Sequence, residues 1–223
     1  MLKKILRIGA SIIDKGRLKN RDFTIIANNC WAGYVYQEMG LQYLTPTVGL
    51  FIHAPCFLRF VSDLKGYFNK DIAFIEESRY ELINENRKSG VFKQYPIGLL
   101  GTDVEVHFIH YTNISEAEKK WSRRIKRINW DNLFVEFCDR DACTPNHLEE
   151  FDTLPFTNKI CFTSKNYSHL KSAIWIKEYE DVPFVGTDLY NICKKYIDII
   201  EWLNSGNVHI SNLRQSINRF LYK

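Results

Sequence analysis

The sequence contains no apolar run that approaches the ~20 residues needed to cross a bilayer, which excludes a transmembrane helix. Its N-terminus lacks the long apolar centre and the small-residue cleavage site of a secretory signal peptide. Internal repeats, low-complexity tracts and linkers that would divide the chain are also missing. We therefore expect one soluble domain over residues 1–223.

Excess charge of one sign is missing as well. The 30 Lys and Arg residues are nearly balanced by 26 Asp and Glu residues, which leaves a formal net charge of +4. Nucleic-acid-binding domains are usually more basic on one face, so no nucleic-acid partner is expected. With 45% hydrophobic and 25% charged residues, the chain has the composition of a globular protein.

The six cysteines have no paired C-x-x-C spacing, which argues against a structural zinc site. A few unpaired, buried thiols are typical of proteins in a reducing compartment. We therefore expect a cytoplasmic protein.

Short apolar runs recur along the chain and alternate with segments of helical periodicity. The clearest run, residues 103–110, alternates polar and apolar side chains as a strand with one buried face does. Strands separated by helices predict an α/β fold, a single layered domain with a mostly parallel sheet of about five to six strands flanked by helices. The runs lie at 23–27, 47–52, 71–75, 103–110, 133–138, 159–163 and 173–176.

Both ends of the chain are basic and amphipathic. Residues 1–21 repeat apolar side chains at helical spacing among lysines and arginines, and residues 205–223 form a basic helical tail. A helix of the first kind either caps the domain or rests on an anionic membrane surface. The sequence thus leaves open a peripheral contact of the N-terminal helix with the inner face of the membrane.

Polar side chains follow several predicted strands at the point where each strand ends. Cys30 lies just past the first strand, His110 ends the alternating strand, and Asp139 follows the next strand. Ser164 and Lys165 follow the strand after that. If these strands run parallel, the side chains meet at the carboxyl edge, where open α/β sheets place their ligand crevice.

Cys30 is the sharpest candidate among them. A thiol at the first turn of a helix feels the positive end of the helix dipole, which lowers its pKa and favours the thiolate. A nucleophile–base–carboxylate triad would then comprise Cys30, His110 and Asp139. Asn28 and Asn29 would stabilise an oxyanion or bind substrate, with Trp31 beside them. The alternative is a buried structural cysteine, a core histidine and two turn-forming asparagines.

A second set of residues suggests a different chemistry. Asp139 and Asp141 form an Asp-x-Asp after an apolar strand, the pattern with which many glycosyltransferases hold a divalent ion on a nucleotide-sugar diphosphate. A predicted helix after the alternating strand carries four basic residues, whose arginine side chains are suited to bind that diphosphate. They are Lys120, Arg123, Arg124 and Arg127. The alternatives are that the two aspartates lie in a solvated loop and that the basic residues form a solvated helix face.

Several motifs occur together and in order, and as a set the chain resembles a bacterial family catalogued as domain of unknown function 1919. The resemblance covers about residues 20 to 205 and departs from the family pattern at Ala32, where a glycine is usual. The motifs are Asn28–Gly33 (NNCWAG), Thr45–Leu50 (TPTVGL), Tyr95–Gly98 (YPIG), His107–Tyr111 (HFIHY), Lys120–Arg124 (KWSRR) and Arg127–Asn132 (RINWDN).

Members of this family are often labelled exopolysaccharide biosynthesis proteins, and some are labelled acetyl- or glycosyltransferases. The resemblance implies a role in exopolysaccharide, capsule or lipopolysaccharide assembly, with a carbohydrate or lipid-linked glycan as substrate. It implies no agreed catalytic residues.

Three hypotheses follow. The first is acyl transfer, with acetyl as the favoured group, from an acyl donor to a glycan through Cys30. The second is glycosyl transfer from a nucleotide sugar with a divalent metal on Asp139 and Asp141. The third is a non-catalytic carbohydrate-binding assembly protein whose Trp31, Tyr34, Trp121 and Trp130 stack on sugars.

Overall fold

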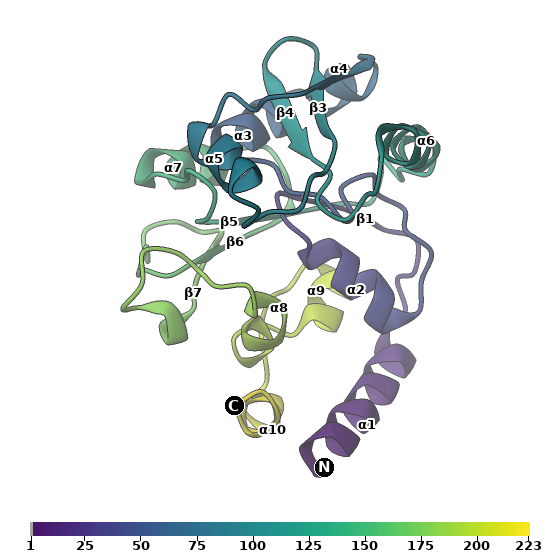
Figure 1. Cartoon of the computed structure of the whole chain (residues 1–223). Helices are drawn as coiled ribbons and strands as arrows, with labels where there is room; N and C mark the ends of the chain where they lie inside the picture. Colours follow the sequence, from purple (N-terminus) through teal and green to yellow (C-terminus); the bar gives the residue numbers. More distant parts are fainter. Residues whose placement is uncertain (1) are drawn as a thin grey trace.

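The computed structural model describes residues 2–223 and contains two separate β-sheets (Figure 1). A parallel sheet has the strand order β1-β5-β6-β7, and a small antiparallel sheet has the order β2-β3-β4. The strands are β1 (Thr24–Ala27), β2 (Ile72–Ile75), β3 (Ile97–Leu100), β4 (Val104–His107), β5 (Leu133–Cys138), β6 (Asn158–Thr163) and β7 (Ala173–Trp175).

Helices and the antiparallel sheet cover the two faces of the parallel sheet, which makes a layered domain (Figure 1). On one face lie α3 (Ala54–Ser62), α4 (Leu64–Phe68), α6 (Ile114–Ile125), α7 (Pro145–Thr153) and the antiparallel sheet, with α5 (Glu81–Lys88) beyond them. On the other lie α2 (Trp31–Met39), α8 (Leu189–Ile192), α9 (Ile199–Ser205) and the 3-10 turns Lys177–Tyr179 and Cys193–Lys195.

Strand β5 shows why the sequence forms this arrangement. Its Val135 and Phe137 side chains belong to the core on one face, and Phe134 and Cys138 belong to the core on the other. A strand that is apolar on both sides must be covered on both sides, which is the usual situation in a parallel α/β sheet. Glu136 is the exception, because its carboxyl group is fully buried in this central strand.

The predicted α/β class, with a parallel sheet flanked by helices, is confirmed. The parallel sheet has four strands, however, rather than five to six. Residues 72–75 and 104–107 pair antiparallel through β3 and belong to the second sheet. The alternation at 103–110 predicts a strand correctly but carries no information about its partner.

The expected strand at 47–52 is irregular chain that covers the outer edge of β1. The Thr47 hydroxyl accepts a hydrogen bond from the Ala27 amide at 3.1 Å, and the Ile52 amide donates to the Asn28 carbonyl at 2.9 Å. A single bridge from Phe51 to His107 joins this segment to β4. Isolated side-chain and backbone bonds thus replace a regular ladder and cover the free edge of the sheet.

The two terminal helices, α1 (Leu2–Arg17) and α10 (Asn212–Leu221), lie side by side at one end of the molecule (Figure 1). Both fall within the segments predicted to be helical. Within residues 2–223, no helix combines the length and the apolar character that crossing a membrane requires.

Candidate functional site

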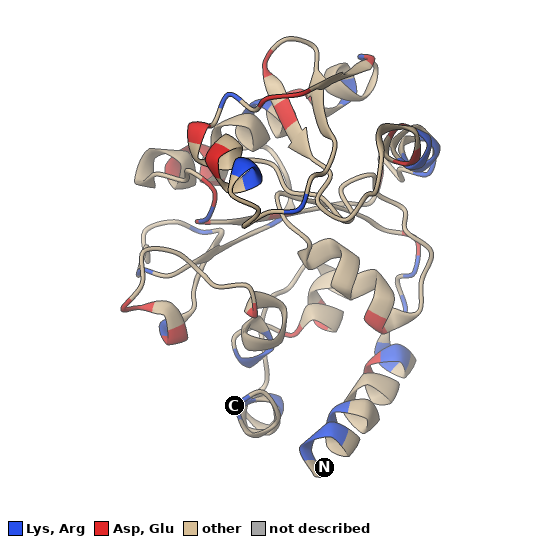
Figure 2. Ribbon diagram, in the orientation of Figure 1, with Lys and Arg blue, Asp and Glu red and all other residues tan. Residues whose placement is uncertain are grey.

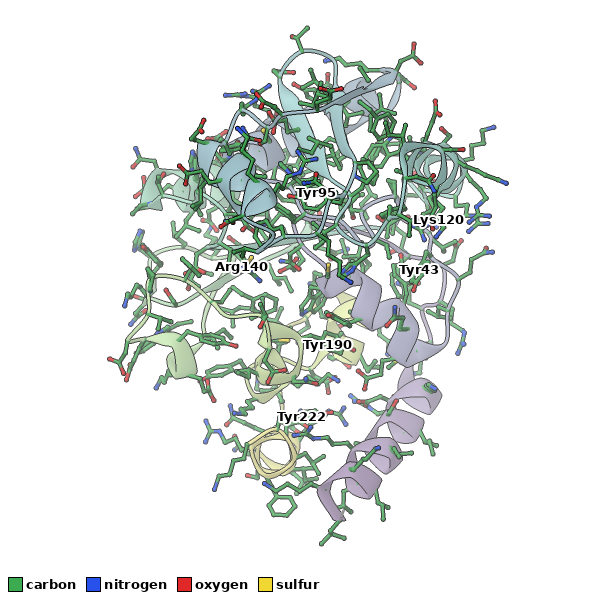
Figure 3. All side chains as sticks on the ribbon, viewed as in Figure 1. Tyr43, Tyr95, Lys120, Arg140, Tyr190 and Tyr222 are labelled. Carbon is green, nitrogen blue, oxygen red and sulfur yellow. The ribbon has the colours of Figure 1, made fainter. Side chains whose placement is uncertain are left out.

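A groove of about 370 Å³ lies between α2, the loop that follows it, the turn after β4, and α6. In Figure 3, Tyr43 and Lys120 lie on the side of the molecule where this groove is. The lining side chains are Cys30, Tyr34, Gln37, Tyr43, Val48, His110, Tyr111, Lys120 and Arg124, with the backbone of Gly33 and Gly49.

Arg124 is the most unusual residue of the groove, because its charged side chain is only 6% exposed. Its Nη1 donates to the Tyr111 hydroxyl at 2.5 Å and to the Val48 carbonyl at 3.3 Å. Its guanidinium carbon lies 4.9 Å from the centre of the Tyr43 ring. All three neighbours are uncharged.

No carboxylate in residues 2–223 lies within 4.0 Å of this guanidinium, and its Nε has no hydrogen-bond partner among them. A buried cation without a counter-ion is costly, because the surrounding protein replaces little of its hydration. Arginine donors are well suited to carboxylate and phosphate oxygens. The groove is therefore equipped to hold an anionic group beside Arg124.

Lys120 lies one turn before Arg124 on α6 and adds a second cation. Its Nζ contacts Glu116 Oε1 at 2.5 Å and lies 5.3 Å from the centre of the Tyr111 ring. The Glu116 carboxylate also accepts the Thr112 amide at 2.9 Å near the helix start. Lys120 is thus partly neutralised, in contrast to Arg124.

His110 lines the groove from a turn, and not from the end of a strand as predicted. Strand β4 ends at His107, and the chain then turns, so His110 is exposed rather than core-facing. Its amide donates to the Gly49 carbonyl at 3.1 Å. Gly49 has a φ of 75°, and a Cβ there would lie 3.2 Å from the Tyr111 ring and 3.3 Å from the His110 Cβ. The glycine allows the two segments to pass closely.

Cys30 lines the same groove, but its predicted low pKa is wrong. It occupies the N-cap of α2, and its Sγ lies 3.8 Å from the Leu50 carbonyl oxygen. Burial raises the pKa of the Cys30 thiol to about 11, with Asp141 and Glu136 raising it further and Arg140 lowering it. The desolvation of the thiolate outweighs the positive end of a nine-residue helix.

Asp139 does not orient His110. One carboxylate oxygen accepts the Ser164 amide at 2.6 Å, and the other accepts the Val185 amide at 2.8 Å. The side chain thus ties the end of β5 to the end of β6 and to the loop near residue 185. The structure brings Cys30 and His110 into one groove and places Asp139 in another part of the sheet edge.

The alternative metal site at Asp139 and Asp141 has no support in the donor geometry, since both Asp139 oxygens are used by backbone amides. Asp141 and Ala142 have φ values of 53° and 64°, in the left-handed region that favours glycine and that aspartate adopts more readily than alanine. Within residues 2–223, no three or more His, Cys, Asp or Glu residues are clustered as a metal site requires.

The asparagines and the tryptophan at the start of α2 have internal partners. The Asn28 amide oxygen accepts the Cys138 amide at 3.2 Å, and the Asn29 amide oxygen accepts the Trp31 amide at 2.7 Å. The Asn29 amide nitrogen donates to Glu136 at 3.1 Å. Trp31 is buried, and its indole donates to Cys193 Sγ at 3.3 Å. None of these three residues lines the groove.

The other two predicted arginines lie outside the groove. Arg123 is exposed, and Arg127 donates to the Tyr43 carbonyl at 3.4 Å. Of the residues expected to stack on sugars, Tyr34 lines the groove. Sequence reasoning missed Tyr43 and Tyr111, which lie on separate segments. The sequence does hold a signal for the burial of Arg124. It lies three residues after the core residue Trp121, and this spacing places it on the inward side of the helix.

Comparison with known proteins agrees with the resemblance that the motifs carry. A family model described as "Domain of unknown function (DUF1919)" matches residues 1–204. An uncharacterized protein of Haemophilus influenzae is 33% identical over 195 residues, which cover 84% of this chain and 87% of the relative. The chain therefore belongs to the DUF1919 family.

Proposed function

We propose that this protein is a transferase of bacterial exopolysaccharide, capsule or lipopolysaccharide assembly that binds a phosphate-linked sugar donor in the groove. The observation that carries the proposal is the buried Arg124, which faces the groove without a carboxylate partner in residues 2–223. A donor phosphate would supply that missing negative charge.

The rest of the groove suits a sugar nucleotide. Tyr34, Tyr43 and Tyr111 present aromatic rings to the cavity, and such rings pack against sugar and base faces. The Gln37 side chain offers an amide to hydroxyl groups. Lys120 extends the positive charge along α6. We place the protein in the cytoplasm, where nucleotide sugars are made.

We assign His110 the role of general base in glycosyl transfer. Its imidazole takes the proton of an acceptor hydroxyl while the acceptor oxygen bonds to the anomeric carbon of the donor. The bond from that carbon to the phosphate oxygen breaks, and its electron pair leaves on the phosphate. Arg124 and Lys120 stabilise the charge that develops there.

Acyl transfer through Cys30 is the second candidate, because Cys30 and His110 line one groove. A thiol whose pKa is raised to about 11 is protonated at neutral pH and is a weak nucleophile. This favours glycosyl transfer, in which Cys30 only forms part of the wall.

Donor consumption distinguishes the two reactions. The protein is incubated with a glycan acceptor and either nucleoside diphosphate sugars or acetyl-coenzyme A, and release of nucleoside diphosphate or of free coenzyme A is followed. We expect nucleoside diphosphate release that Cys30→Ala leaves within about twofold and His110→Ala lowers by roughly 100-fold. Release of coenzyme A that Cys30→Ala abolishes would instead establish the acyl reaction. Binding of a donor without release of nucleoside diphosphate or coenzyme A would indicate a non-catalytic binding protein.

A further inference from the structure

Helix α1 packs on the domain with its polar face. Asp14 is buried and accepts hydrogen bonds from Arg17, at 3.0 Å, and from Arg214 of α10. Arg17 also pairs with Asp198 at 2.5 Å, and the Arg7 Nε donates to the Leu221 carbonyl at 2.7 Å. The contacts that hold the helix are therefore ionic and polar.

The apolar face of α1 is consequently turned outward, the reverse of the usual arrangement for a surface helix. Ile12 and Ile13 are 64% and 61% exposed, although both are large aliphatic side chains. Neighbouring turns expose further residues of the same kind along the helix. They are Leu2, Ile5, Leu6 and Ile8.

Helix α10 continues this apolar surface. Its Leu213, Ile217 and Phe220 point away from the domain, and Leu213 is 75% exposed. Lys3 of α1 lies 5.4 Å from the centre of the Phe220 ring, so the two exposed rows adjoin. Segments from opposite ends of the chain thus build one apolar face, here called the α1/α10 face (Figure 1).

The charge around the α1/α10 face has one sign. Figure 2 shows Lys and Arg along α1 and on α10, at the end of the molecule where both termini lie. The one acidic side chain in residues 2–17 and 212–223 is Asp14, which is buried against two arginines. Arg7, Arg17 and Arg214 bond to the domain, and the exposed cations are Lys3, Lys4, Lys15, Arg219 and Lys223.

We propose that the α1/α10 face docks on a membrane that contains anionic phospholipid. The apolar side chains enter the boundary between headgroups and acyl chains, and the exposed lysines and arginines contact lipid phosphates. A second copy of the chain is the less favourable occupant, because pairing two such faces brings like charges together. This membrane contact does not depend on what the groove binds.

Co-sedimentation with vesicles tests the proposal. We expect the full chain to bind vesicles of phosphatidylcholine mixed with phosphatidylglycerol, and to bind pure phosphatidylcholine at least about tenfold more weakly. High salt lowers the binding, because it screens the attraction between cations and lipid phosphates. Equal binding to both vesicles, or binding to neither, would overturn the proposal.

Matched variants separate docking from a general effect of added charge. Ile5→Asp combined with Leu213→Asp places a carboxylate on each helix of the α1/α10 face. As a control, Leu82→Asp combined with Val91→Asp adds the same two carboxylates on and just after α5, at sites that are 66% and 69% exposed, and α5 lies away from the terminal helices (Figure 1). We expect the double variant of the α1/α10 face to lose binding by about tenfold or more and the control to remain within about twofold of the parent.

Both variants replace exposed side chains, so their unfolding temperatures should stay near that of the parent protein, and this is measured alongside. Unchanged vesicle binding by the double variant would overturn the proposal. So would a dimer in light scattering that the double variant dissociates while vesicles remain unbound, since a second copy would then be the occupant.

Discussion

The guanidinium of Arg124 and the hydroxyl of Tyr111 are joined by a hydrogen bond of 2.5 Å, and both groups donate to the carbonyl of Val48. The hydroxyl accepts from the cation and donates to the carbonyl, so it fixes where the positive charge lies. The Arg124 side chain therefore faces the groove in a defined position without the help of a carboxylate. Because the side chain is already ordered, a ligand anion binds Arg124 without a further loss of side-chain conformational entropy.

Removing this hydroxyl tests its role. We expect Tyr111→Phe to weaken binding of a nucleoside diphosphate sugar by roughly three- to tenfold, because the guanidinium loses a partner that holds it. Stability should fall by about 1 kcal/mol, the typical worth of one hydrogen bond. Calorimetric titration and urea unfolding measure the two effects.

Tyr67→Phe is the matched control for that variant. It removes a hydroxyl that donates to Asp103 at 2.9 Å, away from the groove. Comparable losses of affinity in the two variants would show that the Tyr111 hydroxyl has no special part in holding Arg124.

The buried carboxyl group of Glu136 predicts a dependence of stability on pH. Burial raises its pKa from 4.5 to about 8, against the lowering effect of its hydrogen bond with Asn29. The folded protein therefore keeps a proton that the unfolded chain releases near pH 4.5, so stability falls as pH rises and levels off above about 8. Between pH 6 and pH 9 we expect a loss of roughly 3 kcal/mol from this group.

Glu136→Gln should remove that part of the dependence, because the amide cannot ionise. Urea unfolding at pH 6 and pH 9 measures it, and the exposed Glu149→Gln serves as the control. An identical pH profile for the parent protein and Glu136→Gln would show that Glu136 is already ionised in the folded protein.

The thiol of Cys30 should react slowly with alkylating reagents. With a pKa of about 11, it is almost wholly protonated at pH 8. We expect carbamidomethylation at this position to be roughly 100-fold slower than that of free cysteine, and to accelerate as pH rises. Peptide mapping by mass spectrometry identifies the site, and Cys30→Ser confirms the assignment. Rapid alkylation at pH 7 would contradict the raised pKa and revive the nucleophile hypothesis.

Asp139 should prove to be a structural residue. Asn at this position has one carbonyl oxygen for two backbone amides, so one buried donor loses its partner. We expect Asp139→Asn to lower the free energy of unfolding by about 2 kcal/mol, and the exposed Asp131→Asn to change it little. Loss of activity with unchanged stability would instead indicate a catalytic part.

The elements that sequence predicts well are those with strong local signals. The apolar runs that form β1, β5 and β6 are buried on both faces. Gly40 ends α2 in the left-handed conformation typical of a helix C-cap, which is a local signal of the same kind. The pairing of residues 103–110 was missed, although Gly101, with a φ of 61°, lies in a three-residue connection between β3 and β4. Such a connection favours a hairpin.

The site was predictable only in part, because its properties come from contacts between distant segments. The sequence indicates that Cys30, His110, Lys120 and Arg124 carry chemistry, and all four line the groove. The pKa of Cys30 and the exposure of His110 depend on burial and on the turn after β4, neither of which has a local pattern. The use of both Asp139 oxygens by Ser164 and Val185 is equally invisible in sequence.

The binding of an anionic sugar donor by Arg124 is measured most directly by calorimetric titration of nucleoside diphosphate sugars into three proteins. These are the parent protein, Arg124→Met and Arg123→Met, the last being an exposed arginine on the same helix. We predict that Arg124→Met weakens binding by at least about tenfold while Arg123→Met stays within about twofold of the parent. Equal affinity of all three proteins, or a parent protein that binds neutral sugars as well as phosphate-linked ones, would contradict the proposed function.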